Sequence, residues 1–478
     1  MSKSSRMSPL IPKQKIVIAL QSLIGVNAVI SDPLQMEGFL KEPRNRFHQS
    51  AIAVVQPRTV EDVQRIAVWA NENRIGLIPQ GGNTGLVGGQ VPLCGDEVIV
   101  SLTKLTSIRA VNALAGHMTV EAGLTLQEAQ DAAEAAGALL PLSLASQGSA
   151  RIGGVLSSNA GGVQVLAYGA ARELCLGIEA VLADGRLYKG LNALRKDNTG
   201  YDLRNLLIGA EGTLGIITAA TLKLFPRPEG HETALVNVAS PAAALALFQP
   251  IRARAGAALT AFELIPRFGI DIQLTHKKID RDPAASLSPW YVLVEISRPR
   301  DGAENALLDA LEAALENHLI GDATIAASEK DRLALWTMRE QMSETQSLEG
   351  ASIKHDVSVP VAAVPDLLER GIAAIAKIDP AIRPCPFGHM GDGNIHFNIS
   401  QPADANPAAF LANADSIHNA IYEIVLELGG SISAEHGIGQ LKTGLLKRVK
   451  DPVALEMMRS IKDALDPNGI LNPGKVLD

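Results

Sequence analysis

Cysteine is scarce in this sequence. Its 478 residues include three cysteines, Cys94, Cys175 and Cys385, which lie far apart and never in CxxC spacing. A disulfide framework, an iron–sulfur cluster or a thiolate zinc site needs more thiols, or thiols that lie closer together. The cysteine content therefore argues against all three and favours a reducing, cytoplasmic setting.

Long apolar runs are also missing. A helix that spans a bilayer needs about 20 mainly apolar residues, and no run in the sequence approaches that length. The strongest candidate, residues 16–30, is interrupted by Gln21, Ser22, Gly25 and Asn27. It predicts a short amphipathic helix and no transmembrane segment.

Acidic residues are absent from residues 1–31, whereas Lys3, Arg6, Lys13 and Lys15 are present. This pattern faintly resembles a mitochondrial transit peptide, but arginine is too scarce for one. Over the whole chain basic charge is in deficit, with a net charge of −8, a pI near 5.8 and no basic stripe. We therefore expect no nucleic-acid partner. We expect a cytoplasmic protein, or one of the mitochondrial matrix if the source is a eukaryote.

The length and composition predict a globular protein of two or three domains. A chain of 478 residues is too long for one ordinary core. Hydrophobic residues make up 47% and charged residues 20%, which is typical of globular domains. The composition changes after Pro226-Arg227-Pro228, which is the best candidate for a domain boundary.

The hydrophobic periodicity predicts an α+β chain on both sides of this boundary. Before it, strands are predicted at residues 51–56, 76–79, 98–102, 117–121, 178–182 and 218–225, and helices at 60–73 and 126–136, with Thr59 and Thr125 as N-caps. After it, strands are predicted at 233–238, 259–265, 290–296, 322–327 and 353–359, and helices at 241–254, 303–319, 330–343, 361–378 and 410–428. Two βαβ-like passages in the second part predict a ferredoxin-like cap.

Glycine is concentrated in the segment PQGGNTGLVGGQ, where Gly81, Gly82, Gly85, Gly88 and Gly89 fall within nine residues. Glycine allows positive φ and close backbone approach, so successive N–H groups can form an anion-binding nest. The segment matches neither GxxxxGK[ST] nor a strand–GxGxxG–helix unit. A flexible turn remains the alternative interpretation of this loop alone.

Two further glycine-rich segments strengthen the case for a large ligand. Residues 141–162, PLSLASQGSARIGGVLSSNAGG, contain small residues and a single charge, Arg151. Residues 209–217, GAEGTLGII, lead into the strand predicted at 218–225. A surface linker would explain the first of these segments alone. Three such segments in one region of the chain instead indicate an extended dinucleotide.

The segment GHMGDGNIHFN, residues 388–398, carries His389 and His396 on either side of a turn-forming tetrapeptide. Asn398 follows His396 by two residues, so in a strand their side chains share one face. The turn can fold His389 back toward that face. Two imidazoles and an amide suit a divalent metal such as Zn²⁺ or Mn²⁺, and a hairpin with structural histidines is the alternative.

A second segment, SAEHGIG, offers the carboxylate of Glu435 beside the imidazole of His436. In the helix predicted at 330–343, Arg339 and Ser343 lie one turn apart on one face, and Lys354 opens the next strand. The three could converge on a carboxylate. An exposed helix face with solvated charges is the alternative interpretation.

These motifs together resemble a known family. PQGGNTGLVGG, PLSLASQGSARIGGVLSSNAGG and EGTLGIIT are similar to the FAD-binding segments of the vanillyl-alcohol-oxidase type of flavoprotein. GHMGDGNIHFN, SAEHGIG and the closing NPGK are similar to its FAD-linked D-2-hydroxyacid dehydrogenase branch. The resemblance covers residues 45–478.

The resemblance implies a two-part FAD-binding domain, a ferredoxin-like substrate cap and a C-terminal segment that returns to the flavin. The expected boundaries are an N-terminal helical segment at residues 1–45, the FAD-binding domain at 46–228, the cap at 229–428 and the C-terminal segment at 429–478. The residues that it implies for FAD are Pro79, Gly81, Gly82, Asn83, Thr84, Gly85, Ser143, Gly148, Ser149, Gly153, Asn159, Gly161, Ile217 and Asn472.

The resemblance also implies which residues bind the metal and the substrate and which residue acts as the base. It places a divalent metal, zinc or else manganese, on His389, His396 and Glu435, and it makes His436 the base. It places the substrate on Arg339, Ser343, Lys354 and Asn398. Two residues depart from the expected pattern: Ser343 stands where a threonine is expected, and His355 where an aromatic residue is expected.

The implied activity is oxidation of a D-2-hydroxy acid, D-2-hydroxyglutarate or else D-malate, to the 2-oxo acid by hydride transfer to flavin N5. The electrons would pass to an acceptor other than oxygen, such as an electron-transferring flavoprotein or a quinone, and a homodimer is possible. The alternatives are a D-lactate or glycolate dehydrogenase, a non-catalytic flavoprotein subunit of an electron-transfer complex, and a secreted FAD oxidase.

Overall fold

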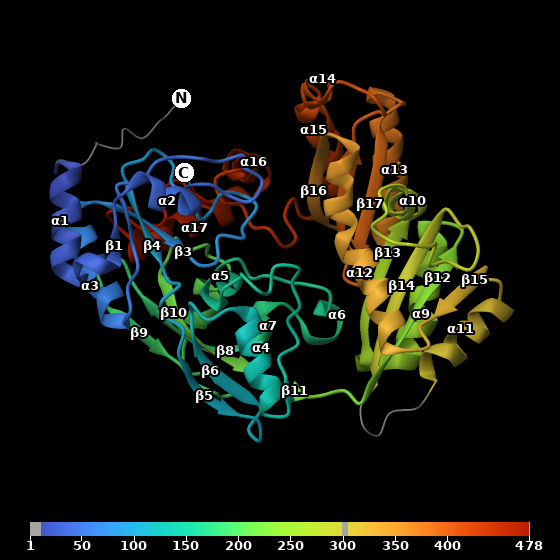
Figure 1. The fold of residues 1–478 in the computed structure, drawn as a ribbon, viewed down its shortest axis with the longest axis horizontal. Helices are drawn as coiled ribbons and strands as arrows, with labels where there is room; N and C mark the ends of the chain where they lie inside the picture. Colours follow the sequence, from blue (N-terminus) through green and yellow to red (C-terminus); the bar gives the residue numbers. More distant parts are fainter. Residues whose placement is uncertain (1–10, 299–304, 478) are drawn as a thin grey trace. The chain divides into compact units, whose positions relative to one another are not determined.

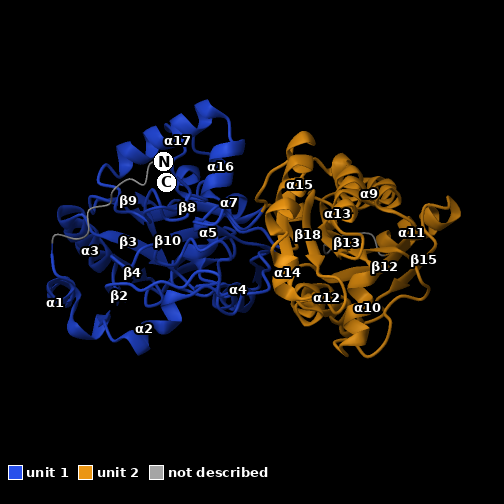
Figure 2. Cartoon of the chain, turned by 90° about the horizontal axis from the view of Figure 1, so that it is seen from above, with its two compact units in different colours: residues 1–162, 170–226, 435–478 blue, residues 163–169, 227–434 orange. Residues whose placement is uncertain are grey.

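The computed structural model describes residues 11–298 and 305–477. Their Cα positions divide into two compact units, which Figure 2 colours separately. Unit 1 comprises the described parts of Met1–Gly162, Ala170–Pro226 and Glu435–Asp478, and unit 2 comprises those of Val163–Gly169 and Arg227–Ala434. Both units mix helices and strands, which confirms the predicted α+β class. Within residues 11–298 and 305–477, every helix is too short or too polar to cross a membrane.

Unit 1 contains three sheets, in the strand orders β1-β2-β4-β3, β5-β6-β10-β8-β9 and β11-β7 (Figure 1). Its strands are β1 Val29–Ile30, β2 Ala53–Val55, β3 Gly76–Gln80, β4 Glu97–Ser101, β5 Ile108–Asn112, β6 His117–Glu121, β7 Ala138–Leu139, β8 Cys175–Val181, β9 Leu187–Gly190, β10 Ile216–Lys223 and β11 Phe225–Pro226. Its helices are α1 Lys13–Ile24, α2 Pro33–Leu40, α3 Val60–Asn73, α4 Leu126–Ala135, α5 Ile152–Ser157, α7 Ala171–Leu174, α8 Leu203–Leu207, α16 Thr443–Val449 and α17 Pro452–Leu465, with the 3-10 turn η1 Val26–Ala28.

Helix α3 shows why the local sequence signals worked. Thr59 accepts a hydrogen bond from the N–H of Asp62, and the Asp62 side chain accepts one from the N–H of Thr59, which completes a capping box. Val63 and Ile66 lie on the buried face of the helix. The helix ends at Arg74, whose φ of 55° is left-handed. The boundaries predicted for this helix are confirmed.

The helix predicted over residues 16–30 is wrong at its C-terminal end. Helix α1 ends at Ile24. The next residue, Gly25, has a φ of 91°, which lies outside the right-handed helical region. The following residues Val29 and Ile30 instead pair antiparallel with β2. Strand pairing at the edge of a sheet therefore overrides the amphipathic pattern in this part of the chain.

Unit 2 is built on one antiparallel sheet of seven strands in the order β15-β12-β14-β13-β17-β18-β16. The strands are β12 Gly230–Val238, β13 Leu259–Pro266, β14 Trp290–Arg298, β15 Asp322–Ile325, β16 Ser352–Ser358, β17 Arg383–His389 and β18 Asn394–Ser400. The helices are α6 Val165–Tyr168, α9 Pro241–Ala255, α10 Arg267–Thr275, α11 Ala306–Glu316, α12 Glu329–Thr345, α13 Val364–Ile378, α14 Pro407–Leu411 and α15 Ala414–Glu427, with the 3-10 turns η2 Gly256–Ala258, η3 Gln346–Glu349 and η4 Val361–Ala363.

Two predicted helices of unit 2 differ from the structure. The helix predicted over 410–428 is two helices, α14 and α15, because the chain leaves the helix at residues 412–413. The helix predicted over 303–319 begins at Ala306, and residues 303–304 lie outside the described part of the chain.

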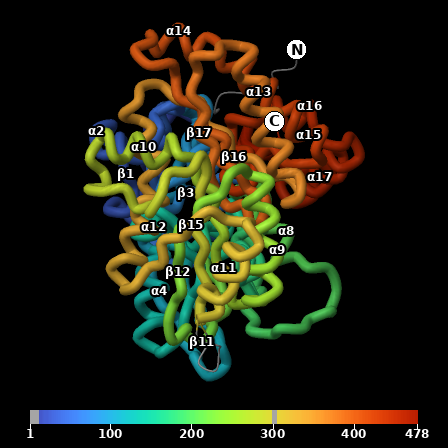
Figure 3. Tube along the Cα trace, turned by 90° about the vertical axis from the view of Figure 1, so that its right-hand side faces the viewer, coloured from blue at the N-terminus to red at the C-terminus, as the bar shows by residue number. Residues whose placement is uncertain are grey.

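Helices cover both faces of the seven-stranded sheet. Helices α10 and α12 pack on one face, whereas α9, α11, α13 and α15 pack on the other. Helices α13 and α15 pack side by side, and they contact strands β17 and β16 (Figures 1 and 3). Because side chains alternate along a strand, Ala261 and Ile265 of β13 join the core under α12, and Phe262 packs against Phe248 of α9. The same alternation turns Glu263 toward α12.

Candidate active site

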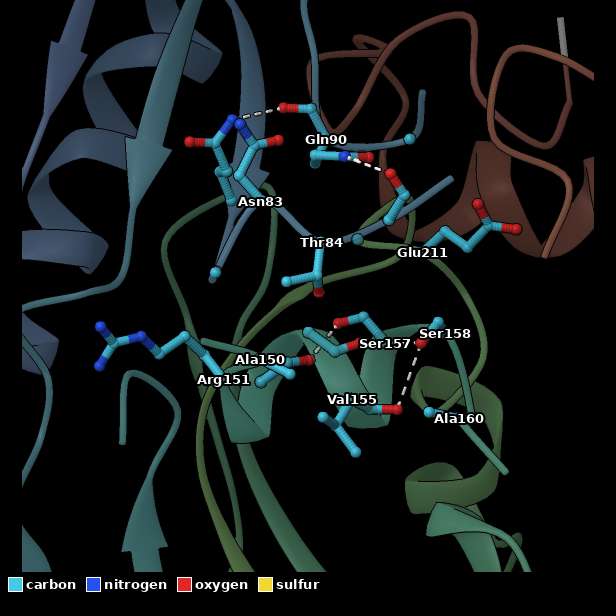
Figure 4. Close-up of a pocket in the computed structure, with 18 of the residues that line it drawn as sticks. Asn83, Thr84, Gln90, Ala150, Arg151, Val155, Ser157, Ser158, Ala160 and Glu211 are labelled. Atoms are coloured by element: carbon cyan, nitrogen blue, oxygen red, sulfur yellow. Dashed lines mark hydrogen bonds between the residues drawn. The ribbon is translucent and has the colours of Figure 1, made fainter. Parts of the chain in front are cut away.

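Unit 1 contains a cavity of about 620 Å³ (Figure 4). The three glycine-rich segments of the sequence form much of its wall, through some of the residues within 79–90, 144–161 and 211–217. Glu435 and His436 of the SAEHGIG segment and Asn472 of the NPGK segment complete the lining. The chain therefore brings five separate segments to one pocket within unit 1.

Most of the residues expected to bind FAD line this cavity. Those that do are Pro79, Gly81, Gly82, Asn83, Thr84, Gly85, Ser149, Gly153, Gly161, Ile217 and Asn472. Ser143, Gly148 and Asn159 are not part of the lining. Asn159 instead uses its side-chain oxygen to accept the N–H of Arg172 at 2.9 Å.

Close backbone approach explains the glycine at position 82. A Cβ atom there would lie 1.9 Å from the carbonyl oxygen of Ser149, a distance that no side chain can occupy. The first glycine-rich loop thus packs directly against the second. At Gly148 a Cβ would meet no atom within 4 Å, so packing in the structure does not require glycine there.

The lining suits a ligand with both donor and acceptor groups. Three of its polar atoms are buried with no hydrogen-bond partner in the described chain: Asn83 Oδ1, Arg151 Nε and Asn472 Oδ1. Buried polar atoms are nearly always paired in folded proteins. Together with a volume in the range of cofactor pockets, they indicate that the cavity is a binding site for a polar cofactor.

Glu211 organises the wall of the cavity and was missed by the sequence reasoning. Its carboxylate accepts the N–H of Ile438 at 2.7 Å and the N–H of Gly439 at 2.8 Å. Burial raises the pKa of Glu211, although the two N–H donors act in the opposite direction. The backbone oxygen of Glu211 also accepts the amide of Asn472 at 2.7 Å. The only signal in the sequence was a lone acidic residue within a glycine-rich segment.

Glu435 and His436 follow one another at the wall of the same cavity. Glu435 Oε1 accepts a hydrogen bond from the N–H of Gly162 at 3.0 Å, which ties the SAEHGIG segment to the end of the second glycine-rich segment. Both residues line the cavity. The structure thus places the predicted base and one predicted metal ligand beside the predicted FAD residues of unit 1.

In unit 2 the segment GHMGDGNIHFN forms the hairpin of β17 and β18. His389 ends β17 and His396 lies near the start of β18. Their rings have centroids 5.4 Å apart, and a ring nitrogen of one lies within 4.8 Å of a ring nitrogen of the other. The expected folding of His389 back toward His396 is therefore present.

Glu263 is a second functional residue that the sequence reasoning missed. It is 1% exposed on β13 and lies directly across from His389 in the strand pairing. Its Oε1 lies 2.7 Å from Nδ1 of His389, and its Oε2 accepts Nε of Arg339 at 2.7 Å. Burial alone would raise the pKa of Glu263, but the charges of His389 and Arg339 outweigh burial and lower the pKa to about 2. A glutamate inside the apolar strand LTAFELIP was the available signal.

The other residues expected to bind substrate have partners within unit 2. Lys354 Nζ donates to the backbone oxygen of Ser343 at 2.8 Å and to its hydroxyl at 2.9 Å. Asn398 donates to the side-chain oxygen of Gln346 at 2.8 Å. Lys354 and Asn398 are cross-strand neighbours in the pairing of β16 with β18. The four predicted residues thus lie along α12 and the sheet face below it.

His355 lies on the opposite face of the sheet from Lys354. Its Nδ1 lies 2.9 Å from the backbone oxygen of Phe397, and its Nε2 lies 2.9 Å from Nδ1 of His418 on α15. Its ring also meets Tyr422 edge to face. His355 therefore packs under α15, away from the face that carries Lys354.

The fold and the cavity define a two-unit cofactor-binding protein, and comparison with known proteins gives its class. Residues 227–476 match the family model of the FAD-linked oxidase C-terminal domain, and residues 51–190 match the FAD-binding domain model. The chain belongs to the FAD-linked oxidases, and it is an FAD-dependent oxidoreductase. The resemblance inferred from the motifs is confirmed.

The named relatives match nearly the whole chain. The chain is 34% identical to D-2-hydroxyglutarate dehydrogenase of Xanthomonas citri pv. viticola over 97% of each chain. It is 38% identical to mitochondrial D-2-hydroxyglutarate dehydrogenase of Danio rerio, over 94% of this chain and 82% of the other. Among solved structures, p-cresol methylhydroxylase with substrate bound matches with a TM-score of 0.78 at 18% identity, over 97% of each chain. That last likeness shows the shared fold.

Proposed function

We propose that the protein oxidises a D-2-hydroxy acid, D-2-hydroxyglutarate in the first place and D-malate in the second, to the 2-oxo acid with FAD as the oxidant. The observation that carries the proposal is the cavity of unit 1, whose glycine-rich walls include His436. Relatives that match most of the chain at 34% and 38% identity bear the name D-2-hydroxyglutarate dehydrogenase, which supports this substrate.

The residues of the cavity suit FAD. Backbone N–H groups of Gly81, Gly82 and Gly85 would bind the pyrophosphate, since close-packed glycine backbone forms anion-binding nests. Asn83 and Asn472 would offer their buried amide oxygens to hydroxyl or amine donors of the cofactor. FAD, when bound, supplies the flavin N5 that accepts the substrate's Cα hydride. The chain's part is to orient the flavin and to exclude water.

A divalent metal, zinc in the first place and manganese in the second, is proposed at His389, His396 and Glu435. Two imidazoles and a carboxylate are a donor set that suits Zn²⁺. A histidine of pKa about 6.5 is a weak base toward an alcohol, and a bound divalent ion lowers the pKa of a coordinated oxygen by roughly eight or nine units. His436, next to Glu435 in the chain, takes the hydroxyl proton as general base.

The substrate's carboxylates are proposed to bind Arg339, Ser343, Lys354 and Asn398. These residues gather on α12 and on the sheet face beneath it. A charge-assisted hydrogen bond contributes about 1.5–3 kcal/mol, so a cation directed at a second carboxylate would select diacids.

A D-lactate or glycolate dehydrogenase is the second candidate, and the pairing of Arg339 favours it. Two of the three guanidinium nitrogens of Arg339, Nε and Nη2, are engaged by Oε2 of Glu263 at 2.7 and 2.6 Å. An arginine held in this way offers less to a second carboxylate than the free fork that a diacid site requires.

Anaerobic bleaching of the flavin absorbance distinguishes the candidates. The purified protein is mixed with D- and L-2-hydroxyglutarate, D-malate, D-lactate and glycolate in turn. The proposal predicts fast bleaching by the D-diacids and slow bleaching by the L-isomer. Bleaching mainly by D-lactate or glycolate would replace the diacid assignment, and flavin that no acid bleaches would indicate an electron-transfer subunit. The electron acceptor is proposed to be an electron-transferring flavoprotein or a quinone.

A further inference from the structure

Helix α12 is anchored to the sheet of unit 2 by two buried arginine–glutamate pairs. Arg332 pairs with Glu295 of β14, and Arg339, seven residues further along the helix, pairs with Glu263 of β13. Both glutamates are 1% exposed. Two turns of helix separate the arginines, so the two pairs repeat one arrangement on neighbouring strands. Their other contacts differ, and the difference indicates separate roles.

Structural partners satisfy the carboxylate of Glu295. Its Oε2 accepts the hydroxyl of Thr233 at 2.8 Å, the indole N–H of Trp336 at 2.6 Å and Nε of Arg332 at 2.7 Å. Its Oε1 accepts Nη2 of Arg332 at 3.1 Å and lies 3.6 Å from Nδ1 of His231, which is longer than a hydrogen bond. Each of these donors belongs to the interface between α12 and the sheet, so this pair holds the helix in place.

The carboxylate of Glu263 is divided between an arginine and a histidine. Arg339 directs both Nε and Nη2 at Oε2, at 2.7 and 2.6 Å. The opposite oxygen, Oε1, lies 2.7 Å from Nδ1 of His389. A carboxylate that accepts a hydrogen bond from Nε of a guanidinium and forms an ion pair with its Nη2 is ionised, so it can only accept hydrogen bonds. The proton between Oε1 and the imidazole therefore resides on Nδ1, and when the ring is neutral Nε2 is the atom that presents a lone pair.

We propose that Glu263 is the positioning residue of the metal site: its Oε1 holds His389 in the Nδ1–H tautomer, and its Oε2 fixes Arg339 at the same time. The inference rests on the metal site proposed above. A carboxylate behind a metal-binding imidazole orients the ring, fixes its tautomer and raises its basicity. The same carboxylate links a ligand of the metal to a residue expected to bind substrate.

The test is the metal affinity of Glu263→Gln, measured by competition with a chromophoric chelator for Zn²⁺ and for Mn²⁺. The amide keeps one acceptor but turns an NH₂ group toward His389 or Arg339, where it meets a donor. The expected result is a 10- to 100-fold weaker affinity, the range seen when such partners are removed. Glu295→Gln is the matched control, because it breaks an equally buried arginine pair that has no contact with His389. The metal affinity of Glu295→Gln should equal that of the wild-type protein.

Unchanged metal affinity in Glu263→Gln would overturn the positioning role, and so would equal losses in Glu263→Gln and Glu295→Gln. A wild-type protein that binds neither Zn²⁺ nor Mn²⁺ would overturn the proposed metal site itself, which distinguishes that failure from failure of the positioning role. FAD content and circular dichroism show whether each variant folds.

The tautomer can also be measured without a variant of Glu263. Nitrogen-15 NMR of histidine-labelled wild-type protein, with the metal removed, reports which ring nitrogen carries the proton. His389→Asn identifies the signal by its disappearance. A protonated Nδ1 is expected, and a proton on Nε2 with an unprotonated Nδ1 would overturn the inference even if Glu263→Gln failed to fold.

Discussion

At the residue scale, the proposed proton transfer depends most on His436. It lines the cavity of unit 1 and follows Glu435, whose carboxylate is held by the N–H of Gly162. His436→Ala should lower kcat about 10²–10⁴-fold, the range for loss of a general base. Rapid-mixing kinetics of flavin reduction measure this effect. Because the cavity walls are mainly glycine-rich backbone, the variant should retain its FAD, and near-normal turnover would remove His436 from the role.

The cysteines give a second prediction at this scale. Burial raises the pKa of both Cys175 and Cys385 to about 12, so at pH 8 only roughly one such thiol in ten thousand is ionised. Cys94 is exposed. Iodoacetamide at pH 8 should therefore modify Cys94 in the folded protein, and Cys175 and Cys385 only after unfolding, as read by peptide mass spectrometry. Modification of Cys385 in the folded protein would contradict the burial of its thiol in β17.

At the element scale, the carboxylate of Glu211 anchors the C-terminal half of the SAEHGIG segment. Glu211 accepts the N–H groups of Ile438 and Gly439, and it is buried. Glu211→Gln keeps only one acceptor, so amide hydrogen exchange across residues 437–441 should become faster. Glu97→Gln is the matched control, because Glu97 holds the N–H groups of a different loop, at residues 93–96. Equal exchange in residues 437–441 of Glu211→Gln and wild type would contradict the anchoring role.

Most elements were predictable because their signals are local. The capping boxes at Thr59 and Thr125 mark the starts of α3 and α4, and alternation and turn chemistry mark the hairpin of β17 and β18. The end of α1 was not predictable in this way, since Val29 and Ile30 are committed by pairing with a strand more than twenty residues further on. Pairing across the chain is a tertiary effect that a local pattern does not contain.

The residues of the candidate site also fall into two groups, those that the sequence identifies locally and those that it does not. Glycine-rich loops and histidine motifs carry their chemistry in the residue type, so His389, His396 and His436 could be identified from the sequence. Glu211 and Glu263 could not, because each acts through a partner distant in sequence, at Ile438 and at His389. In the sequence, each is only an acidic residue within an apolar or glycine-rich segment. Its role can be inferred only when the fold shows which group the buried carboxylate contacts.

At the scale of the whole molecule, the residues proposed for the reaction come from both units. Unit 1 supplies the FAD cavity with Glu435 and His436, and unit 2 supplies His389, His396 and the residues proposed to bind substrate. The relatives named D-2-hydroxyglutarate dehydrogenase match across both units, which is consistent with one shared activity. Because the FAD cavity lies within unit 1 and two of the proposed metal ligands, His389 and His396, belong to unit 2, FAD retention and metal dependence should be separable.

The most direct test of this account is removal of the metal from the complete protein. The protein is treated with a chelator, its flavin content is measured, and D-2-hydroxyglutarate is added anaerobically with and without Zn²⁺ or Mn²⁺. FAD should stay bound, flavin bleaching should be abolished by chelation, and Zn²⁺ or Mn²⁺ should restore the bleaching. Bleaching at full rate in protein shown to be free of metal would contradict the account.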